Sequence, residues 1–248
     1  MTSPSWPPGG LDPLLETLQE TYLPDVTHYD LAGLLNDPRL GRTAVVSSFG
    51  AESVVLLHYV NRVRPGTEVL FIDTGKHFAQ TLAYRDQLVA DFGLRIVNVG
   101  PDPRALASED PYGAMFGADP NTCCAIRKVF PLQDAIAGYG CWISGRKRYQ
   151  ASTRANIPVL ERDGAKIKIN PLAMWDRDRI AAYIADHDLP PHPLESQGFP
   201  SIGCEPCTRA VRPGEDQRGG RWAGSPDKTE CGIHLGPDGR FSRVGPRS

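Results

Sequence analysis

Four of the six cysteines in this chain form two close pairs, and such pairs often bind metal. Cys204 and Cys207 have CxxC spacing, and Cys123 and Cys124 are neighbours about 80 residues earlier. Successive helical residues are about 100° apart, so neighbouring thiols can face one cluster, whereas a disulfide between them would be strained. Four thiolates suit zinc or a 4Fe–4S cluster, and the adjacent pair favours one 4Fe–4S cluster per chain. The alternative for Cys123 and Cys124 is a pair of buried structural cysteines.

Cys231 stands apart from these pairs in the polar run 228–234, which reads KTECGIH. A thiol becomes a nucleophile when nearby positive charge lowers its pKa. Lys228, His234 and the arginines that precede them could supply that charge. The alternative is a surface cysteine on a loose tail. Cys141, the sixth cysteine, opens an expected strand, and we interpret it as structural.

The segment Ser47–Ser53 reads SSFGAES and joins an expected strand to an expected helix. A small-residue turn of this kind presents backbone N–H groups and hydroxyls to an anion at a helix N-terminus. It lacks the lysine of the Walker P-loop, and an ordinary turn is the alternative. Asp73-Thr74-Gly75 ends the next expected strand on the same sheet edge, where open α/β sheets bind ligands. Together these turns predict a nucleotide-sized pocket, although Asp73 alone could simply cap a turn.

Basic residues fall in groups that could bind a sulfate or phosphate. Guanidinium groups match the oxygens of these anions, although such runs are usually solvated faces. Lys128 and Arg127 each follow one of the adjacent cysteines by four residues, so we expect both to share a helix face with a metal ligand. Trp222 could close over a ligand. The two arginine groups are Arg146, Arg148 and Arg154, and then Arg209, Arg212, Arg218 and Arg221.

Strands and helices alternate along the chain, which predicts an α/β fold with an open, mostly parallel sheet and helices on both faces. We expect Asn121 or Thr122 to cap a helix at 123–136 and Asp176 to cap a helix at 176–187. The expected strands are 43–49, 69–72, 95–99, 141–144 and 166–169. The expected helices are 54–60, 81–92, 123–136 and 176–187, after two short ones at 14–22 and 31–35.

Composition places the chain among globular proteins of the cytoplasm. The formal net charge of −2 gives no reason to expect nucleic acid, and no apolar run is long enough to span a membrane. The N-terminus lacks the features of a secretory signal, and cysteines in a cytoplasmic chain favour metal or thiol chemistry. We expect a flexible segment 1–12, a single α/β domain 13–211 with the metal site, and a mobile C-terminal lid 212–248 with Cys231.

Four motifs together resemble the sulfonucleotide reductases, and more narrowly their iron–sulfur branch, the adenylyl-sulfate reductases. The likeness runs from about Val45 to Leu235. Phosphoadenylyl-sulfate reductases generally keep the ECGIH-type ending but lack the cluster cysteines. The motifs are Cys123-Cys124-x-x-Arg127-Lys128, Gly145-Arg146-x-x-x-Gln150, Cys204-x-x-Cys207 and Glu230-Cys231-Gly232-Ile233-His234.

The resemblance implies an adenine-nucleotide α-hydrolase-like fold, with a modified pyrophosphatase-type loop at Ser47–Ser53. It implies a 4Fe–4S cluster on the four paired cysteines and Cys231 as the nucleophile. The thiolate would attack the sulfur of adenylyl sulfate, and thioredoxin or glutaredoxin would then release sulfite. The residues expected to contact the substrate are Ser47, Ser48, Gly50, Glu52, Ser53, Asp73, Thr74, Gly75, Lys128, Gly145, Arg146, Gln150, Arg154, Arg218, Arg221 and His234.

The sequence is also compatible with other kinds of protein. The nearest is phosphoadenylyl-sulfate reductase. An ATP-dependent RNA thiolase shares the fold, but it would need a loop of the SGGxDS kind where this chain has Phe49 and Glu52. A non-enzymatic metal module could use the same four cysteines. The sequence also leaves a homo-oligomer open.

Overall fold

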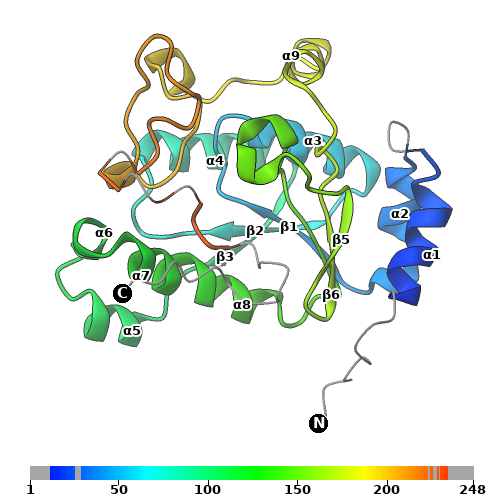
Figure 1. Cartoon of the computed structure of the whole chain (residues 1–248), viewed down its shortest axis with the longest axis horizontal. Coiled ribbons are helices and arrows are strands. Elements are labelled where there is room, and N and C mark those ends of the chain that lie inside the picture. Colours follow the sequence, from blue (N-terminus) through cyan, green and yellow to red (C-terminus); the bar gives the residue numbers. More distant parts are fainter. Residues whose placement is uncertain (1–11, 26–28, 223, 226–227, 229, 234–248) are drawn as a thin grey trace.

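The computed structural model describes residues 12–25, 29–222, 224–225, 228 and 230–233. Within them, the expected open α/β sheet is present with helices on both faces (Figure 1). The strand order is β3-β2-β1-β4-β6-β5, and every neighbouring pair is parallel except β5 and β6. The strands are β1 Thr43–Ser47, β2 Glu68–Ile72, β3 Arg95–Val99, β4 Cys141–Ile143, β5 Leu160–Asp163 and β6 Lys166–Ile169.

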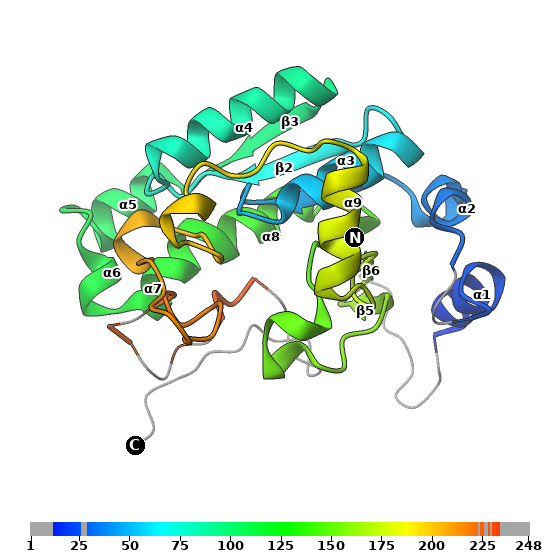
Figure 2. The same ribbon diagram turned by 90° about the horizontal axis from the view of Figure 1, so that it is seen from above.

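Helices cover the two faces of the sheet in separate layers (Figures 1 and 2). One layer contains α3 Ser53–Val63, α4 Ala79–Phe92 and α9 Arg177–Asp186, with α1 Pro13–Tyr22 and α2 Leu31–Asn36 beside it. On the other side lie α5 Pro103–Glu109, α6 Met115–Ala118, α7 Pro120–Cys124, a π-helix Ala125–Val129 and α8 Phe130–Ile136. None of the helices in the described ranges is long and apolar enough to cross a bilayer.

Each face of the sheet packs into its own hydrophobic cluster. On the α3 side, Val45 and Phe71 meet the apolar face of α3, including Leu57. On the α8 side, Leu70 and Ile72 meet Leu132 and Ile136 of α8 together with Trp142. All five residues of β1 are buried, as expected for a parallel strand that is covered on both faces.

The region 103–136 differs from the sequence prediction in its helices. The single helix expected at 123–136 is instead α7, a π-helix and α8, because Pro131 lacks the N–H that an unbroken α-helix would donate to Arg127. The expected caps Asn121 and Thr122 are wrong. Asp119 is the cap, and its carboxylate accepts hydrogen bonds from the N–H groups of those two residues at 2.9 and 3.0 Å. The short helices α5 and α6 were not predicted.

The edge strand β5 was also missed by the sequence prediction. Its sequence, LERD, lacks both the β-branched run and the apolar alternation that signal a strand. It pairs antiparallel with β6, which matches the common pattern of an antiparallel edge on a parallel sheet. The N-cap of α9 is Asp176, as predicted, and its carboxylate accepts from the N–H of Arg179 at 2.8 Å.

The strand order reverses at β1, and this reversal fixes where a ligand can bind. The sheet extends from β1 to β2 and β3 on one side and to β4 on the other. Loops that leave the carboxyl ends of β1 and β4 therefore diverge, and open α/β sheets bind ligands in the gap between such loops. The segment 198–222 lies over the same end of the molecule, beside α6 and α7 in both views (Figures 1 and 2).

Phe71 anchors β2 and offers a test of the core. Its ring is fully buried and meets the ring of Phe49 edge-on, with ring centroids 5.6 Å apart. We expect Phe71→Ala to lower the free energy of unfolding by about 3–5 kcal/mol, because it removes a buried ring and leaves a cavity. Urea unfolding measures this change. Tyr112→Ala is the matched control, since Tyr112 is 94% exposed. An equal effect in both variants would contradict the packing described.

Candidate active site

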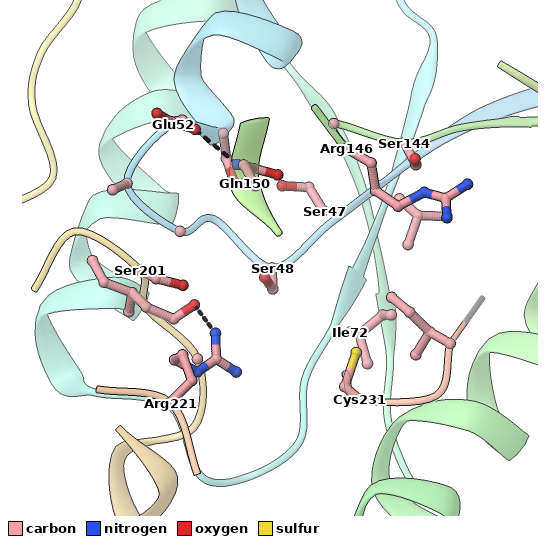
Figure 3. Close-up of a pocket in the computed structure, with 18 of the residues that line it drawn as sticks. Ser47, Ser48, Glu52, Ile72, Ser144, Arg146, Gln150, Ser201, Arg221 and Cys231 are labelled. Carbon is pink, nitrogen blue, oxygen red and sulfur yellow. Dashed lines mark hydrogen bonds between the residues drawn. The ribbon is translucent and has the colours of Figure 1, made fainter. Parts of the chain in front are cut away.

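A cavity of about 210 Å³ lies between the carboxyl ends of β1 and β4 (Figure 3). Its position is the one that the reversal of strand order predicts. Segments from across the chain meet there, and each brings polar or charged side chains. The lining includes residues 46–48, 50–53, 144–147 and 200–204, and single residues such as Ile72, Lys128, Gln150, Arg154, Arg218, Arg221, Glu230 and Cys231.

Most of the substrate contacts expected from the sequence line this cavity. Asp73 and Gly75 do not line it. The Asp73 carboxylate instead accepts a hydrogen bond from the N–H of Gly75 at 2.9 Å, which closes a turn. His234 lies outside the described residues. The expected contacts on the cavity wall are Ser47, Ser48, Gly50, Glu52, Ser53, Thr74, Lys128, Gly145, Arg146, Gln150, Arg154, Arg218 and Arg221.

The turn after β1 has a conformation suited to an anion. Phe49 has a positive φ of 53°, which is rare for a residue with a side chain, and its buried ring compensates for the strain. The hydroxyl of Ser47 accepts the Phe49 N–H at 3.1 Å. At the start of α3, the N-cap Glu52 makes no hydrogen bond to the first turn. The first N–H groups of α3 therefore lack a capping side chain, as in helix N-termini that bind anions.

Glu52 instead connects this turn to the loop after β4. Its carboxylate accepts hydrogen bonds from Tyr149 at 2.6 Å and Gln150 at 2.8 Å, and it lies 3.0 Å from Nζ of Lys147. Burial opposes the charge on Glu52, but Lys147 and the two hydrogen bonds outweigh it and hold the pKa of Glu52 below its usual value. Lys147 is fully buried and was not among the expected site residues. The signal available for it was its place in the basic loop after β4.

Two partly buried arginines, Arg218 and Arg221, place positive charge on the cavity wall. Arg221 donates from Nη1 to the carbonyl of Ile202 at 3.0 Å, and its Nε is buried without a partner in the described part of the chain. Gly203 permits this arrangement, because a Cβ there would lie 2.1 Å from Nη2 of Arg221. Burial lowers the pKa of Arg218 to about 10 and also lowers the pKa of Arg221. Both guanidinium groups flank the ring of Trp222. A desolvated pair of this kind favours an anionic ligand.

The segment that carries Cys231 forms the remaining wall. Cys231 is half-buried, and its side chain points into the cavity near Ile72 (Figure 3). Glu230 forms ion pairs with Arg154 and Arg218, at 2.6 and 3.3 Å. Sequence reasoning missed the position of Glu230, although it is the immediate neighbour of the proposed nucleophile.

The four paired cysteines line a second, smaller hollow next to the cavity. The two sites share Lys128, Cys204 and Trp222. Sγ of Cys204 lies 3.3 Å from the hydroxyl of Thr74. The backbone of Cys207 accepts the N–H of Trp222 at 2.9 Å, so residues near the start of the expected lid are bound to the CxxC segment. The mobility expected for 212–248, and the domain bounds as a whole, stay predictions.

The thiols fit a 4Fe–4S cluster by their chemistry. Burial raises the pKa of Cys123 to about 11 and also raises the pKa of Cys124 and Cys207, so a bound metal would be needed to keep them ionised. In the described residues, no three His, Cys, Asp or Glu side chains converge closely enough on one point to hold a single ion. Each ligand of a 4Fe–4S cluster binds a different iron, so its four thiols need no such convergence.

Lys128 links the two sites by charge. Burial alone would lower its pKa, but the nearby thiols of Cys204, Cys124 and Cys231 outweigh burial and raise it. Burial would likewise raise the pKa of Cys204, yet Lys128 and Thr74 hold it below its usual value. A lysine in this position stays charged and can offset negative charge on either side.

Arg127 forms a buried ion pair that fixes the loop after β2. Its Nη2 lies 2.6 Å from the Asp110 carboxylate, and its Nη1 donates to the carbonyl of Thr74 at 2.9 Å. Both side chains of the ion pair are almost completely buried. Asp110 was not singled out from the sequence, because nothing local links it to a residue on the π-helix.

Comparison with known proteins gives consistent matches. The phosphoadenosine phosphosulfate reductase domain matches residues 42–210. Two proteins named adenosine 5′-phosphosulfate reductase are similar over most of this chain. The one from Mesorhizobium japonicum is 54% identical over 77% of this chain and 76% of its own length. The one from Chelativorans sp. is 53% identical over 79% and 80%.

Solved structures with the same fold include a phosphoadenylyl-sulfate reductase from Candida auris. Its TM-score is 0.65 at 23% identity, and the match covers 82% of this chain and 98% of that one. An FMN adenylyltransferase from Candida glabrata has a TM-score of 0.53 at 14% identity, covering 73% and 60%. At these identities the likeness concerns the fold alone.

The Asp110–Arg127 pair predicts a pH-dependent loss of stability. We expect Asp110→Asn to cost about 3 kcal/mol at neutral pH, because it leaves Arg127 buried without its counter-charge. Burial opposes ionisation of Asp110, but Arg127 and the Met115 N–H hold its pKa below the usual value. The contribution of the pair is therefore complete above the unfolded pKa, about 3.9, and is lost as pH falls through the folded pKa.

Urea unfolding at a series of pH values measures this difference. Wild type and Asp110→Asn should differ by a constant amount from about pH 5 to 8 and converge in more acidic solution. Asp86→Asn is the control, since Asp86 pairs with Arg85 at an exposed position where such pairs contribute about 0–1 kcal/mol. A loss in Asp110→Asn no greater than that of the control would be inconsistent with a buried ion pair.

Proposed function

The chain belongs to the phosphoadenosine phosphosulfate reductase domain family, and on that premise we propose that it reduces adenylyl sulfate to sulfite and AMP. The observation that carries the proposal is that the turn after β1, two partly buried arginines and Cys231 meet in one cavity. Relatives that are 53–54% identical are named adenosine 5′-phosphosulfate reductase. The reaction would serve sulfate assimilation in the cytoplasm.

The cavity walls offer separate places for the parts of the substrate. The turn Ser47–Ser53 and the N-terminus of α3 suit the phosphate of adenylyl sulfate. Lys128, Arg218 and Arg221 lie on the side of Cys231, where they would bind the sulfate and stabilise the charge that develops on the leaving AMP. The adenosine would lie in the gap between β1 and β4, at the carboxyl ends of these strands.

The first chemical step is attack by the Cys231 thiolate on the sulfur of adenylyl sulfate. A sulfur–sulfur bond forms, the bond between that sulfur and the phosphate oxygen breaks, and AMP leaves with the electron pair. The sulfonate group stays on Cys231. Cations on the cavity wall would stabilise the negative charge on the departing phosphate.

The second step requires an external dithiol. Cys231 has no other cysteine within twenty residues of sequence. Cys123, Cys124, Cys204 and Cys207 line the second hollow, where they would bind the cluster, and Cys141 is buried in β4. A thiolate of thioredoxin or glutaredoxin would attack Sγ of Cys231, and sulfite would leave with the electron pair. The second thiol of the donor would then resolve the mixed disulfide and restore Cys231. The dithiol supplies both electrons.

Cys123, Cys124, Cys204 and Cys207 would hold one 4Fe–4S cluster, whose charge would act on the cavity through Lys128. The residues around it have their own tasks. Thr74 orients Cys204, Arg127 holds the loop that carries Thr74, and the ring of Trp222 lies against the guanidinium of Arg221.

Phosphoadenylyl sulfate is the second candidate substrate, because the matching domain family is named for its reductases. Steady-state kinetics with both nucleotides decides between them. We expect kcat/KM to favour adenylyl sulfate by about tenfold or more, a difference of about 1.4 kcal/mol. A preference for the 3′-phosphorylated nucleotide would assign the chain to the other activity.

Replacement of Cys231 tests whether this residue is the nucleophile or a metal ligand. We expect Cys231→Ser to keep about four iron and four sulfide per chain and to lose sulfite production, since a hydroxyl is a far weaker nucleophile. Cys207→Ser is the matched variant and should lose iron. Iron analysis and a sulfite assay give both readouts. Loss of iron from Cys231→Ser would place Cys231 among the ligands and favour a simple metal module.

A further inference from the structure

Glu230 forms ion pairs with two arginines beside Cys231, the proposed nucleophile. Its carboxylate accepts two hydrogen bonds from Arg154, from Nε at 2.6 Å and from Nη2 at 2.8 Å. Arg218 donates to the same carboxylate at 3.3 Å. A two-point pairing between a guanidinium and a carboxylate fixes both position and orientation.

Each of the three guanidinium nitrogens of Arg154 donates a hydrogen bond in this arrangement. Its third nitrogen, Nη1, donates to the side chain of Gln150 at 2.7 Å, and Gln150 donates in turn to Glu52 at 2.8 Å. A continuous row of polar contacts thus connects the Cys231 segment to the anion-binding turn before α3. The Arg154 side chain is only 11% exposed, so solvent screens its ion pair less than a surface pair.

We propose that Glu230 is a positioning residue, whose ion pair with Arg154 keeps the Cys231 side chain pointing into the cavity. Because Glu230 and Cys231 are adjacent, fixing one side chain limits the directions open to the other. Ile233 packs among the apolar residues on the α8 side of the sheet, which gives the segment a second anchor on the other side of Cys231. The role in catalysis rests on the proposed function, but the ion pair itself can be tested without it.

The two steps of the reaction place opposite demands on this ion pair. Attack on the substrate needs Cys231 inside the cavity, so the closed pair favours the first step. Attack by an external dithiol needs Sγ of the same residue to be reachable, so the pair must open afterwards. Glu230 therefore sets a balance between the two positions of Cys231.

The experiment measures how fast iodoacetamide alkylates Cys231 in the intact protein. Trypsin releases residues 229–240, in which Cys231 is the one cysteine, so mass spectrometry follows this thiol alone. The rate is read at alkaline pH where it no longer rises with pH, so that a changed thiol pKa has no influence. Glu230→Gln should raise the rate by about 3- to 10-fold, the factor expected for loss of a charge-assisted, partly buried pair.

A double-mutant cycle and a matched control make the result specific. Arg154→Lys keeps the charge but loses the forked geometry, so it should raise the rate as Glu230→Gln does, and the double variant should rise no further. Glu215→Gln removes a carboxylate that pairs with Arg209 away from the cavity, and it should alkylate like wild type. An unchanged rate in Glu230→Gln, or additive effects in the double variant, would overturn the proposal.

Release of AMP from adenylyl sulfate without reductant gives the second readout. Glu230→Gln should release its first equivalent of AMP more slowly than wild type, while Glu215→Gln should not. If wild type releases no AMP but the alkylation pattern holds, the proposed function fails and the positioning role stands. If wild type releases AMP but Glu230→Gln alkylates normally, the positioning role fails alone.

Discussion

The reversal of strand order at β1 is the constraint on which the rest of the site depends. The sheet grows from β1 to β2 on one side and to β4 on the other, so the loops at their carboxyl ends diverge. The resulting gap is lined by residues as distant in sequence as Ser47 and Cys231. Without this gap the turn after β1, the two arginines and the thiol of Cys231 would not line one cavity.

The charged side chains in this gap are affected by burial and by nearby groups of opposite charge. Burial lowers the pKa of Arg218 and of Arg221. Glu230 and Cys231 partly oppose this for Arg218, and the nearby thiols partly oppose it for Arg221. Lys128 belongs both to the cavity and to the hollow of the four cysteines, so the two sites form one electrostatic unit. A change of charge among the thiols therefore acts directly on groups that line the cavity.

Sequence patterns predicted the parts of this structure that depend on local chemistry. The buried β-branched runs gave β1 to β4 within about two residues at each end, and the Asp176 cap gave the start of α9. Polar turns at the strand ends indicated the pocket because parallel strands bring such turns to one edge. Most of the expected contacts line that pocket, including Lys128 and Arg221.

The features that escaped prediction depend on partners that are distant in sequence. Glu230 and Arg154 are 76 residues apart in sequence, and Asp110 and Arg127 are 17 residues apart. Strand β5 is defined by its pairing with β6, and its own residues carry no strand signal. Burial of Lys147 follows from the fold around Glu52, whereas its sequence context resembles a solvated basic loop.

The proposed reaction requires Cys231 to accept the sulfonate group of adenylyl sulfate. The most direct measurement is mass spectrometry of the protein after incubation with adenylyl sulfate in the absence of any dithiol. The tryptic peptide 229–240 should gain one sulfonate group, and an equal amount of AMP should appear. AMP without an adduct on this peptide, or a sulfonate on another cysteine, would contradict it.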